Sequence, residues 1–287
     1  MLTDDDVPRI WAELGLPGIL DVHVHFMPDS VMRKVWAYFD RAGYGVDWQI
    51  SYRGDDDNRR ERLAAMGVRR FPSLVYPHKP DMAAWLNEWA DGFADTHPEV
   101  WKTFTFYPEP SAAEYVRTAL ERGARIGKVH LEVGAYDPRD PQLDAVWGMC
   151  ADAGVPMITH CSGTPVDGPF TGPGPIGEVI ARHPELKIVV AHMGNPETAD
   201  FLDLAEKYRE VRLDTTMAFT DFDATRPARV PDLARLRDLQ PKILFGSDFP
   251  NIPFAYGHAV ESIVRLGLGD DWCRDVLWRN AADLLGA

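Results

Sequence analysis

Short apolar runs alternate with amphipathic stretches along nearly the whole chain. The runs are rich in β-branched and aromatic residues, as buried strands are, and the stretches between them repeat apolar positions at helical spacing. This alternation is typical of repeated strand and helix units and predicts a parallel sheet. Eight strands are expected, near Ile19 to Phe26, Val68 to Tyr76, Thr103 to Tyr107, Ile126 to Val133, Met157 to His160, Ile188 to His192, Val211 to Thr215 and Ile243 to Asp248.

Two of the expected helices have readable ends. Asp140 and Pro141 begin a segment that ends at Gly154, and Asn195-Pro196 begins one that runs to about Glu210. No long polar linker and no second composition regime interrupts the alternation of strands and helices. The chain has 287 residues, and α/β barrels of about 250 residues commonly form one domain. We therefore predict a single (β/α)₈ TIM-barrel domain over residues 1–287.

Extra material is expected at three places along this barrel. An insertion after the first strand covers about residues 29–58, with a helix over Asp29 to Arg41 and an irregular loop over Ala42 to Asn58. The stretch CSGTPVDGPFTGPGP after the fifth strand is dense in glycine and proline, which predicts a loop without helix. A C-terminal helix is expected over about residues 270–285. Because loops after barrel strands form the active-site face, the first two segments are expected near the site.

The net charge of the chain argues against some classes of binding partner. The chain has 30 Lys and Arg against 44 Asp and Glu, a formal net charge of -14. Such an acidic surface repels phosphate backbones and anionic membranes. We therefore expect a small-molecule substrate, and neither nucleic acid nor a membrane, as the partner. A homo-oligomer stays open.

Cysteine usage and the N-terminal residues bear on the compartment. Three cysteines are too few, and odd in number, for a disulfide framework in a chain of this size. The N-terminal residues MLTDDDVPRIWAEL are acidic and lack the apolar core of a secretory signal, and no run reaches the roughly 18 apolar residues of a membrane span. A cytoplasmic location is therefore expected.

Polar residues alternate along the first expected strand. Asp21, His23 and His25 are separated by single apolar residues, so a two-residue period places all three on one face, toward the barrel interior. Buried polar groups are costly unless they are satisfied, and a divalent metal would use the two imidazoles as ligands. Two histidines in this pattern are equally compatible with a structural role.

Three further polar residues follow separate apolar strands. His160 ends PMITH, His192 ends IVVAH and Asp248 ends ILFGSD. The carboxyl ends of barrel strands form the catalytic face, so these side chains are expected to converge there with His23 and His25. Taken together, the five residues predict a metal site.

The fourth expected strand also carries polar residues on one face. Lys128, His130 and Glu132 alternate with apolar residues there, so all three are predicted to line the interior. A structural role is open for two of them. Lys128 can pair with a carboxylate such as that of Glu132 or Asp248, and His130 can be a satisfied interior histidine.

The ordered set of DVHVH, His160, His192 and FGSDFP resembles the amidohydrolase superfamily. More narrowly, it resembles the amidohydrolase-related family, which includes aminocarboxymuconate semialdehyde decarboxylase and resorcylate decarboxylases. The resemblance spans Asp21 to Asp248. It implies a barrel fold and a metal, and it leaves the substrate undetermined.

The resemblance also implies a role for each matching residue. His23, His25 and His160 would be metal ligands, Asp248 would be both a ligand and the acceptor of a proton from water, and His192 would be catalytic. Zinc is the first candidate for the ion, and manganese and iron suit the same ligands. In family members with two metals a carboxylated lysine bridges the ions, so a second ion is expected only if Lys128 is carboxylated.

Three functions remain open at the level of the sequence. The leading one is metal-assisted hydrolysis of an amide, ester or lactone, in which the metal lowers the pKa of water. The second is decarboxylation of an aromatic or dienoic acid without hydrolysis, for which Arg53 or Arg59 would supply a cationic group to bind the acid. The third, from another class, is a barrel that binds a metal or metabolite without catalysis.

Overall fold

The structure is a computed structural model that describes residues 2–42, 48–163, 168–221 and 232–286. The chain falls into two compact units. The first consists of Met1–Phe71 with Thr215–Ala287, and the second consists of Pro72–Asp214. Parts of the two insertions predicted from the sequence, residues 43–47 and 164–167, lie outside the described residues.

The second unit is built on a parallel sheet. Strands β4 to β8 pair in chain order, for example Gly127 with Met157 and Ile188 with Val211. All residues of β4, β6 and β7 are buried, and β7 is purely apolar, as a strand covered on both faces can be. The strands are β3 Val100–Trp101, β4 Thr103–Thr105, β5 Ile126–His130, β6 Met157–His160, β7 Ile188–Val190 and β8 Val211–Asp214.

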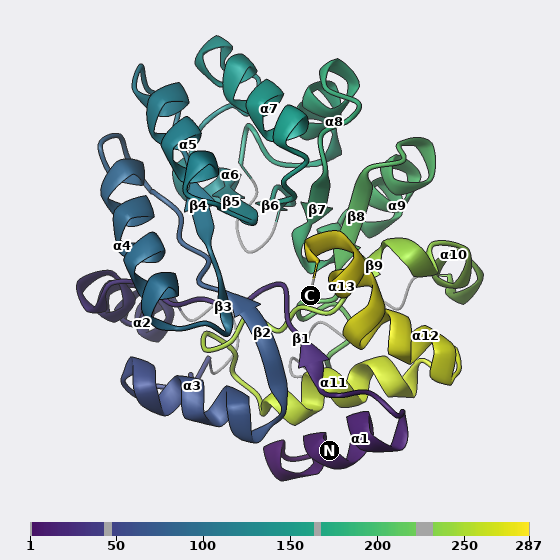
Figure 1. The fold of residues 1–287 in the computed structure, drawn as a ribbon. Helices are drawn as coiled ribbons and strands as arrows, with labels where there is room; N and C mark the ends of the chain where they lie inside the picture. The colour runs from purple at the N-terminus through teal and green to yellow at the C-terminus, as the bar shows by residue number, and fades with distance from the viewer. Residues whose placement is uncertain (1, 43–47, 164–167, 222–231, 287) are drawn as a thin grey trace. The chain divides into compact units, whose positions relative to one another are not determined.

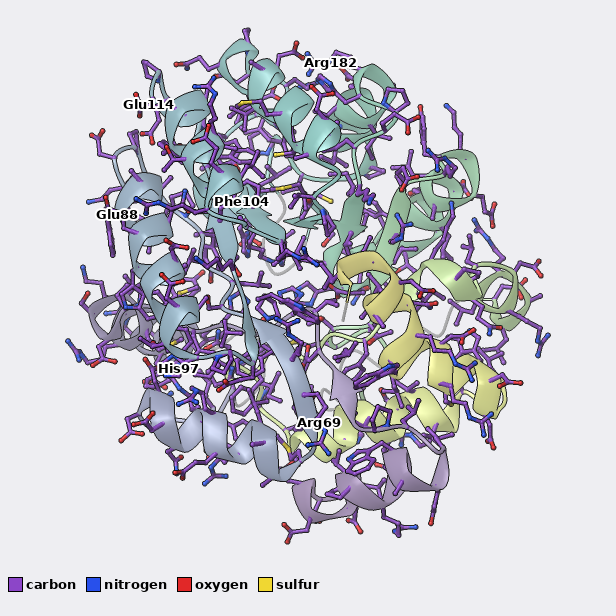
Figure 2. All side chains as sticks on the ribbon, in the orientation of Figure 1. Arg69, Glu88, His97, Phe104, Glu114 and Arg182 are labelled. Carbon is purple, nitrogen blue, oxygen red and sulfur yellow. The ribbon has the colours of Figure 1, made fainter. Side chains whose placement is uncertain are left out.

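Helices cover the outer side of this sheet (Figure 1). Buried Phe104 lies on β4, whereas the charged side chains of Glu88, Glu114 and Arg182 lie on the outer helices (Figure 2). The helical segments of the unit are α4 Ala83–Thr96, α5 Ala112–Glu121, α6 Leu131–Gly134, α7 Pro141–Ala153, α8 Pro173–Arg182, the 3₁₀ turn η2 Ala191–Gly194 and α9 Thr198–Lys207.

Helix α7 shows how the local sequence sets these boundaries. The Asp140 carboxylate accepts a hydrogen bond from the amide of Gln142, and Pro141 occupies the first helical position, where its missing N–H costs nothing. Gly154 ends the helix in the left-handed region, with φ of 63°. Both ends agree with the sequence prediction.

The first unit contains the two terminal parts of the chain. Strands β1 and β2 are parallel, with Ile19 opposite Val68. Beyond β1 the chain stays close to the last strand segment, because Val22 donates to Phe245 O and Val24 pairs with Phe249. The elements are η1 Asp4–Asp6, α1 Val7–Glu13, β1 Ile19–Leu20, α2 Asp29–Ala42, α3 Asp56–Ala65, β2 Val68–Pro72, α10 Leu233–Asp238, η3 Gln240–Lys242, β9 Ile243–Leu244, α11 Tyr256–Arg265, α12 Asp270–Arg274, the π-helical turn η4 Asp275–Arg279 and α13 Asn280–Leu285.

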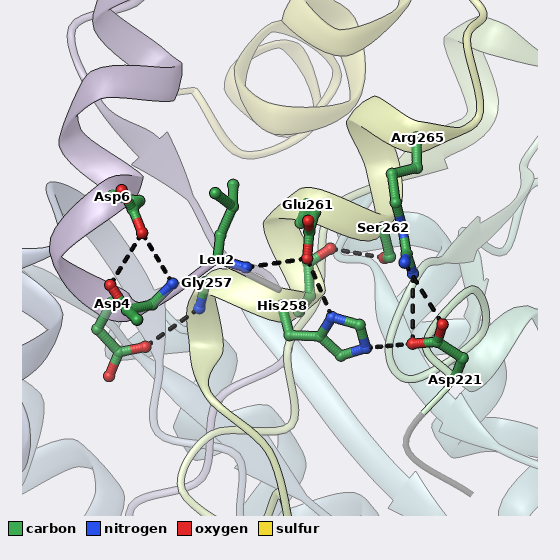
Figure 3. Close-up of polar contacts among 11 residues, drawn as sticks. Leu2, Asp4, Asp6, Asp221, Gly257, His258, Glu261, Ser262 and Arg265 are labelled. Carbon is green, nitrogen blue, oxygen red and sulfur yellow. Dashed lines mark hydrogen bonds and ion pairs between the residues drawn. The ribbon is translucent and has the colours of Figure 1, made fainter. Parts of the chain in front are cut away.

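A polar cluster fixes the N-terminal segment against α11 (Figure 3). The fully buried imidazole of His258 lies between two carboxylates, with Nε2 2.7 Å from Asp221 and Nδ1 3.3 Å from Glu261. Glu261 also accepts a hydrogen bond of 3.0 Å from the amide of Leu2. The N-terminal residues, α11 and the segment after β8 are thereby tied together within the first unit.

Several strands are shorter than the sequence predicts. The first predicted strand, Ile19 to Phe26, is regular only over its first two residues, and β5 ends at His130 instead of Val133. The prediction that Glu132 lies on the same strand face as Lys128 is therefore wrong. The chain turns because the His130 side chain accepts the amide of Val133 and caps the short helix α6.

Other boundaries also differ from the expected ones. A helix, α1, precedes the first strand, and the loop of the first insertion ends at Asp55 because the side chain of that residue caps α3. The predicted C-terminal helix is present over Asp270 to Leu285 but includes a π-helical turn.

The cysteines lie in the core. Cys150, Cys161 and Cys273 are all free and buried, as expected without a disulfide framework. Burial raises the pKa of the Cys150 thiol to about 12 and that of Cys273 to about 11, so both are protonated at neutral pH. Among the described residues, none of the helices combines the length and apolar character needed to cross a membrane.

Candidate metal centre

Two histidines and an aspartate meet in the first unit. His23 and His25 follow β1, and Asp248 follows β9. Oδ1 of Asp248 lies 3.0 Å from Nε2 of His25 and 3.6 Å from Nε2 of His23. The His23 and His25 side chains are 1% and 4% exposed, and the Asp248 side chain is 14% exposed. The two histidines are therefore almost fully shielded from solvent, whereas the carboxylate is partly accessible.

These three side chains fit a divalent metal ion. Donor atoms around one ion, with bonds of about 2.1 Å, lie roughly 3 to 3.5 Å apart. The distances from Asp248 are close to this range, and one donor atom of each residue lies within 4.8 Å of the other two. Two imidazoles and a carboxylate are a donor set that zinc accepts. The prediction that His23, His25 and Asp248 come together is therefore supported by their geometry.

A buried carboxylate fixes the backbone on both sides of this group. Oδ1 of Asp21 accepts hydrogen bonds from the amide of His23 at 3.0 Å and from the amide of Ser247 at 3.2 Å. Its Oδ2 accepts from the Tyr256 hydroxyl at 3.0 Å. Asp21 has no exposed surface, and this burial raises its pKa to about 7 despite the hydrogen bonds, which favour the charged form.

Asp248 adopts a backbone conformation that is unusual for an aspartate. Its φ is 70°, its amide donates to His23 O at 2.8 Å, and its carbonyl accepts the amide of Asn251. The Asn251 side chain in turn accepts a hydrogen bond from Trp36 Nε1 at 3.1 Å. A left-handed non-glycine residue persists only where its surroundings fix it, and here they turn the carboxylate toward the two histidines.

The second unit holds a separate row of histidines. The rings of His130 and His160 are stacked, with centroids 3.8 Å apart, and the His192 ring meets His160 edge-on at 4.8 Å. Glu132 lies beside this row, with Oε2 3.8 Å from His160 Nε2. His130, Glu132 and His160 also offer donor atoms within 4.8 Å of one another. The Tyr76 ring also lies beside His130, with centroids 5.0 Å apart.

His192 is carried by a turn that leaves the strand. β7 ends at Val190, and His192, Met193 and Gly194 have φ of 58°, 53° and 68°. At Gly194 an added Cβ would lie 2.0 Å from the ring of Phe201, so no larger residue fits. The prediction that His192 extends the strand is therefore wrong, although the residue does follow its end.

Lys128 lies inside the second unit. It is 1% exposed on β5, and its carbonyl accepts a hydrogen bond from the Thr105 hydroxyl. Lys128, Glu197 and Asp214 all act electrostatically on Cys161, whose thiol pKa is raised mainly by burial. The interior placement predicted for Lys128 is confirmed, and its carboxylation stays a prediction.

The predicted site residues thus divide between the two units. His23, His25 and Asp248 form one group, and His130, Glu132, His160 and His192 form another. The assignment of His160 as a further ligand of the metal held by the first group stays a prediction.

Sequence reasoning missed the role of Asp214, which accepts the amide of His192. The available signal was an acidic residue at the end of the apolar run VRLD.

Of the two arginines proposed from the sequence for binding an acid, only Arg59 is buried. Arg53 pairs with Asp40 in a partly exposed position. The Arg59 guanidinium, paired with Asp56, is 1% exposed and lies 5.1 Å from the Phe26 ring and 5.3 Å from the Trp36 ring. Its Nε and Nη1 have no hydrogen-bond partner within the described part of the chain.

Comparisons with known proteins bear on this geometry. Residues 20–287 match the family model described as Amidohydrolase. None of the curated protein sequences matches the chain significantly. An uncharacterized TIM-barrel protein from Bordetella bronchiseptica is 20% identical, with a TM-score of 0.73 over 94% of this chain and 98% of that one.

Two further solved structures are similar over the same part of the chain. The 5-carboxyvanillate decarboxylase of Sphingomonas paucimobilis is 13% identical, with a TM-score of 0.62 over 94% of this chain and 99% of that one. A probable 2-pyrone-4,6-dicarboxylic acid hydrolase from Acinetobacter baumannii is 12% identical, with a TM-score of 0.62 over 94% and 100%. At these identities the likeness establishes the fold, which is a (β/α)₈ barrel as the alternation of apolar runs predicts.

The raised pKa of Asp21 predicts a pH dependence of stability in the metal-free protein. The unfolded chain loses this proton near pH 3.8 and the folded chain near pH 7. Between these values the folded state binds more protons, so the free energy of unfolding falls as pH rises and then levels off. Urea denaturation between pH 4.5 and 8 in the presence of a chelator measures this trend.

The matched variant for this prediction is Asp21→Asn, which keeps an oxygen to accept both amides but has no proton to lose. Relative to it, the wild type should lose stability between about pH 4 and 7 and change no further above pH 7. A difference between the two proteins that stays constant across the whole range would contradict the assignment.

The crowding at Gly194 predicts a large cost for Gly194→Ala. The variant must adopt a left-handed conformation, which costs about 1–2 kcal/mol, and must also move the Phe201 ring, which adds about 1–3 kcal/mol for overpacking. Gly123→Ala is the control, because Gly123 has φ of 85° and no atom within 4 Å of an added Cβ. Equal losses of unfolding free energy in the two variants would show that the contact with Phe201 carries no cost.

Proposed function

The chain belongs to the amidohydrolase family, and from this premise we propose that it is a metal-dependent hydrolase of a small molecule. The bond broken would be the C–N or C–O bond of an amide, ester or lactone. The observation that supports a metal-dependent reaction is the group of His23, His25 and Asp248, in which two buried imidazoles and a carboxylate offer converging donors.

His23 and His25 would hold the metal together with Asp248, and the family resemblance adds His160 as a further ligand. Zinc is the proposed ion, and a second ion is proposed only if Lys128 is carboxylated. When bound, the metal supplies a Lewis acid that polarises a carbonyl and makes water a stronger nucleophile near neutral pH. The burial of both histidines favours this chemistry, since charges interact more strongly where water is excluded.

Two residues of the chain would move the protons. The Asp248 carboxylate, the most exposed of the three donors, accepts the proton of the attacking water. The half-exposed imidazole of His192 donates a proton to the leaving group or a hydrogen bond to the developing oxyanion. Asp21 takes no part in the proton transfer and fixes the backbone that carries the ligands.

Decarboxylation is the second candidate, and Arg59 is the observation that favours it. A buried guanidinium with two unpartnered nitrogens among the described residues suits a carboxylate, which it can bind in a bidentate manner. Phe26, whose ring it covers, directly follows the ligand His25. The similar structures include a 5-carboxyvanillate decarboxylase and a probable hydrolase of a dicarboxylic acid, so an acid substrate is compatible with either reaction.

Variants of the metal group test the proposed chemistry. Protein purified without chelator should contain about one zinc per chain, and His25→Ala should lower the affinity by more than the roughly 10- to 100-fold that loss of an outer partner costs. Asp248→Asn should keep part of the metal and lose turnover, because an amide does not accept the proton. Elemental analysis and a screen of esters, amides, lactones and carboxylic acids provide the two readouts.

The control is His183→Ala, which removes a histidine that pairs with Asp144 at the end of α8. It should change neither metal content nor turnover. Full turnover in Asp248→Asn would show that Asp248 does not accept the proton of the attacking water. A wild-type protein that holds zinc but stays inert across the whole screen would instead favour a binding protein without catalysis.

Arg59 variants separate an acid substrate from a neutral one. Arg59→Met should raise KM for a carboxylate-bearing substrate by about 10- to 100-fold, corresponding to the roughly 1.5–3 kcal/mol of a charged hydrogen bond, and should leave neutral analogues unaffected. Arg53→Met is the matched control from the same insertion. Equal effects of the two variants would argue against recognition of the substrate by Arg59. Release of carbon dioxide from the substrate would show that the reaction is a decarboxylation and would contradict hydrolysis.

A further inference from the structure

A fully buried carboxylate receives the backbone amide of His192. Oδ1 of Asp214 accepts this hydrogen bond at 2.9 Å, and Asp214 has no exposed surface. His192 follows β7 and Asp214 ends β8, and these neighbouring strands pair in parallel up to Val190 and Leu213. Where that pairing ends, the Asp214 side chain provides the acceptor for an amide that follows the strand.

The backbone bound by Asp214 is one that would not persist unaided. His192 and Met193 are both left-handed, a conformation that is unfavourable for a residue with a Cβ. Such conformations are kept where neighbouring groups fix them. On one side of the turn Phe201 closes against Gly194, and on the other side Asp214 holds the first left-handed residue by its N–H.

The consequence of this turn is the direction of one imidazole. The His192 ring stands edge-on to His160, at 4.8 Å and an interplanar angle of 62°, and it is half-buried where His160 is buried. An extended continuation of β7 would alternate side chains across the sheet and would not hold the ring at this angle. The position of the ring therefore depends on the bond between the His192 amide and Asp214.

We propose that Asp214 is a positioning residue for the reaction, acting through His192. This inference rests on the proposed function, in which His192 handles a proton or stabilises an oxyanion. Asp214 need not meet the substrate. It holds the backbone so that the imidazole is placed before the substrate arrives, and such preorganisation is where much of the effect of a catalytic group comes from.

Four variants test the inference with the substrate found by the screen. Asp214→Ala removes the acceptor and should lower kcat by about 10- to 100-fold with little change in KM or zinc content, as loss of an outer partner does. Asp214→Asn keeps an oxygen at the same place and should restore most of kcat. His192→Gln tests the residue through which Asp214 acts, and the double variant Asp214→Ala with His192→Gln should be no slower than His192→Gln alone.

Each outcome decides between the two proposals. Full turnover in His192→Gln would refute the catalytic role of His192, whatever Asp214 does. An inactive His192→Gln together with an unchanged Asp214→Ala would refute the positioning role alone. Further loss in the double variant, or no rescue by Asp214→Asn, would show that Asp214 acts by its charge or by another route, and would also overturn the inference.

A spectroscopic readout covers the case in which Asp214→Ala does not fold. Asp214→Ser keeps a buried hydroxyl but is too short to reach the His192 amide in the same way. In ¹H–¹⁵N spectra the His192 amide should shift upfield in Asp214→Ser, since its hydrogen bond to a carboxylate is lost, and should stay near the wild-type position in Asp214→Asn. An unshifted His192 amide in Asp214→Ser would overturn the proposal.

Discussion

The buried hydrogen bonds of Asp21 are the interaction on which the candidate metal centre depends. A carboxylate without exposed surface is costly, and it is tolerated here because two amides and a hydroxyl donate to it. One of these amides belongs to His23 and the other immediately precedes Asp248. A single side chain therefore fixes the two backbone segments that carry the candidate ligands, and it leaves the side chains of those residues available for a metal.

The histidines of the second unit are held by packing of their rings. The His130 and His160 rings are stacked and His192 meets His160 edge-on, so the three rings pack against one another. One of them, His192, is left half-exposed by a left-handed turn. In both units an aspartate at or just after a strand end, Asp21 or Asp214, accepts a hydrogen bond from the backbone amide of a histidine. The two units thus use the same type of hydrogen bond to fix the backbone of a histidine.

Hydrolysis and decarboxylation place similar demands on such a centre. Both use a metal held by imidazoles and a carboxylate, so these residues cannot distinguish them. The groups that contact the rest of the substrate carry that information. Arg59 is the candidate proposed for such a group, because a guanidinium that is buried near the Phe26 and Trp36 rings and only partly paired is maintained against its desolvation cost. Phe26, beside which Arg59 lies, directly follows His25 in the chain.

The sequence by itself determined the barrel, the order of its strands and which histidines lie at or beyond their carboxyl ends. Apolar runs that must be buried on both faces can form only interior strands, and polar residues at their carboxyl ends have a defined edge to occupy. The sequence could not determine where each strand stops. Glu132 was expected on a strand and lies in a helical turn, because the His130 side chain captures a backbone amide.

Only the tertiary structure revealed how the functional side chains are held. The hydrogen bonds of Asp21 span 226 residues to Ser247, and those of Asp214 span 22 residues to His192. No local spacing encodes such contacts, since they depend on which strand ends become neighbours in the fold. The left-handed turn at His192 likewise depends on Phe201, which comes from the following helix. Residue types and periodicity therefore predict the candidate side chains, whereas long-range packing decides how those side chains are arranged.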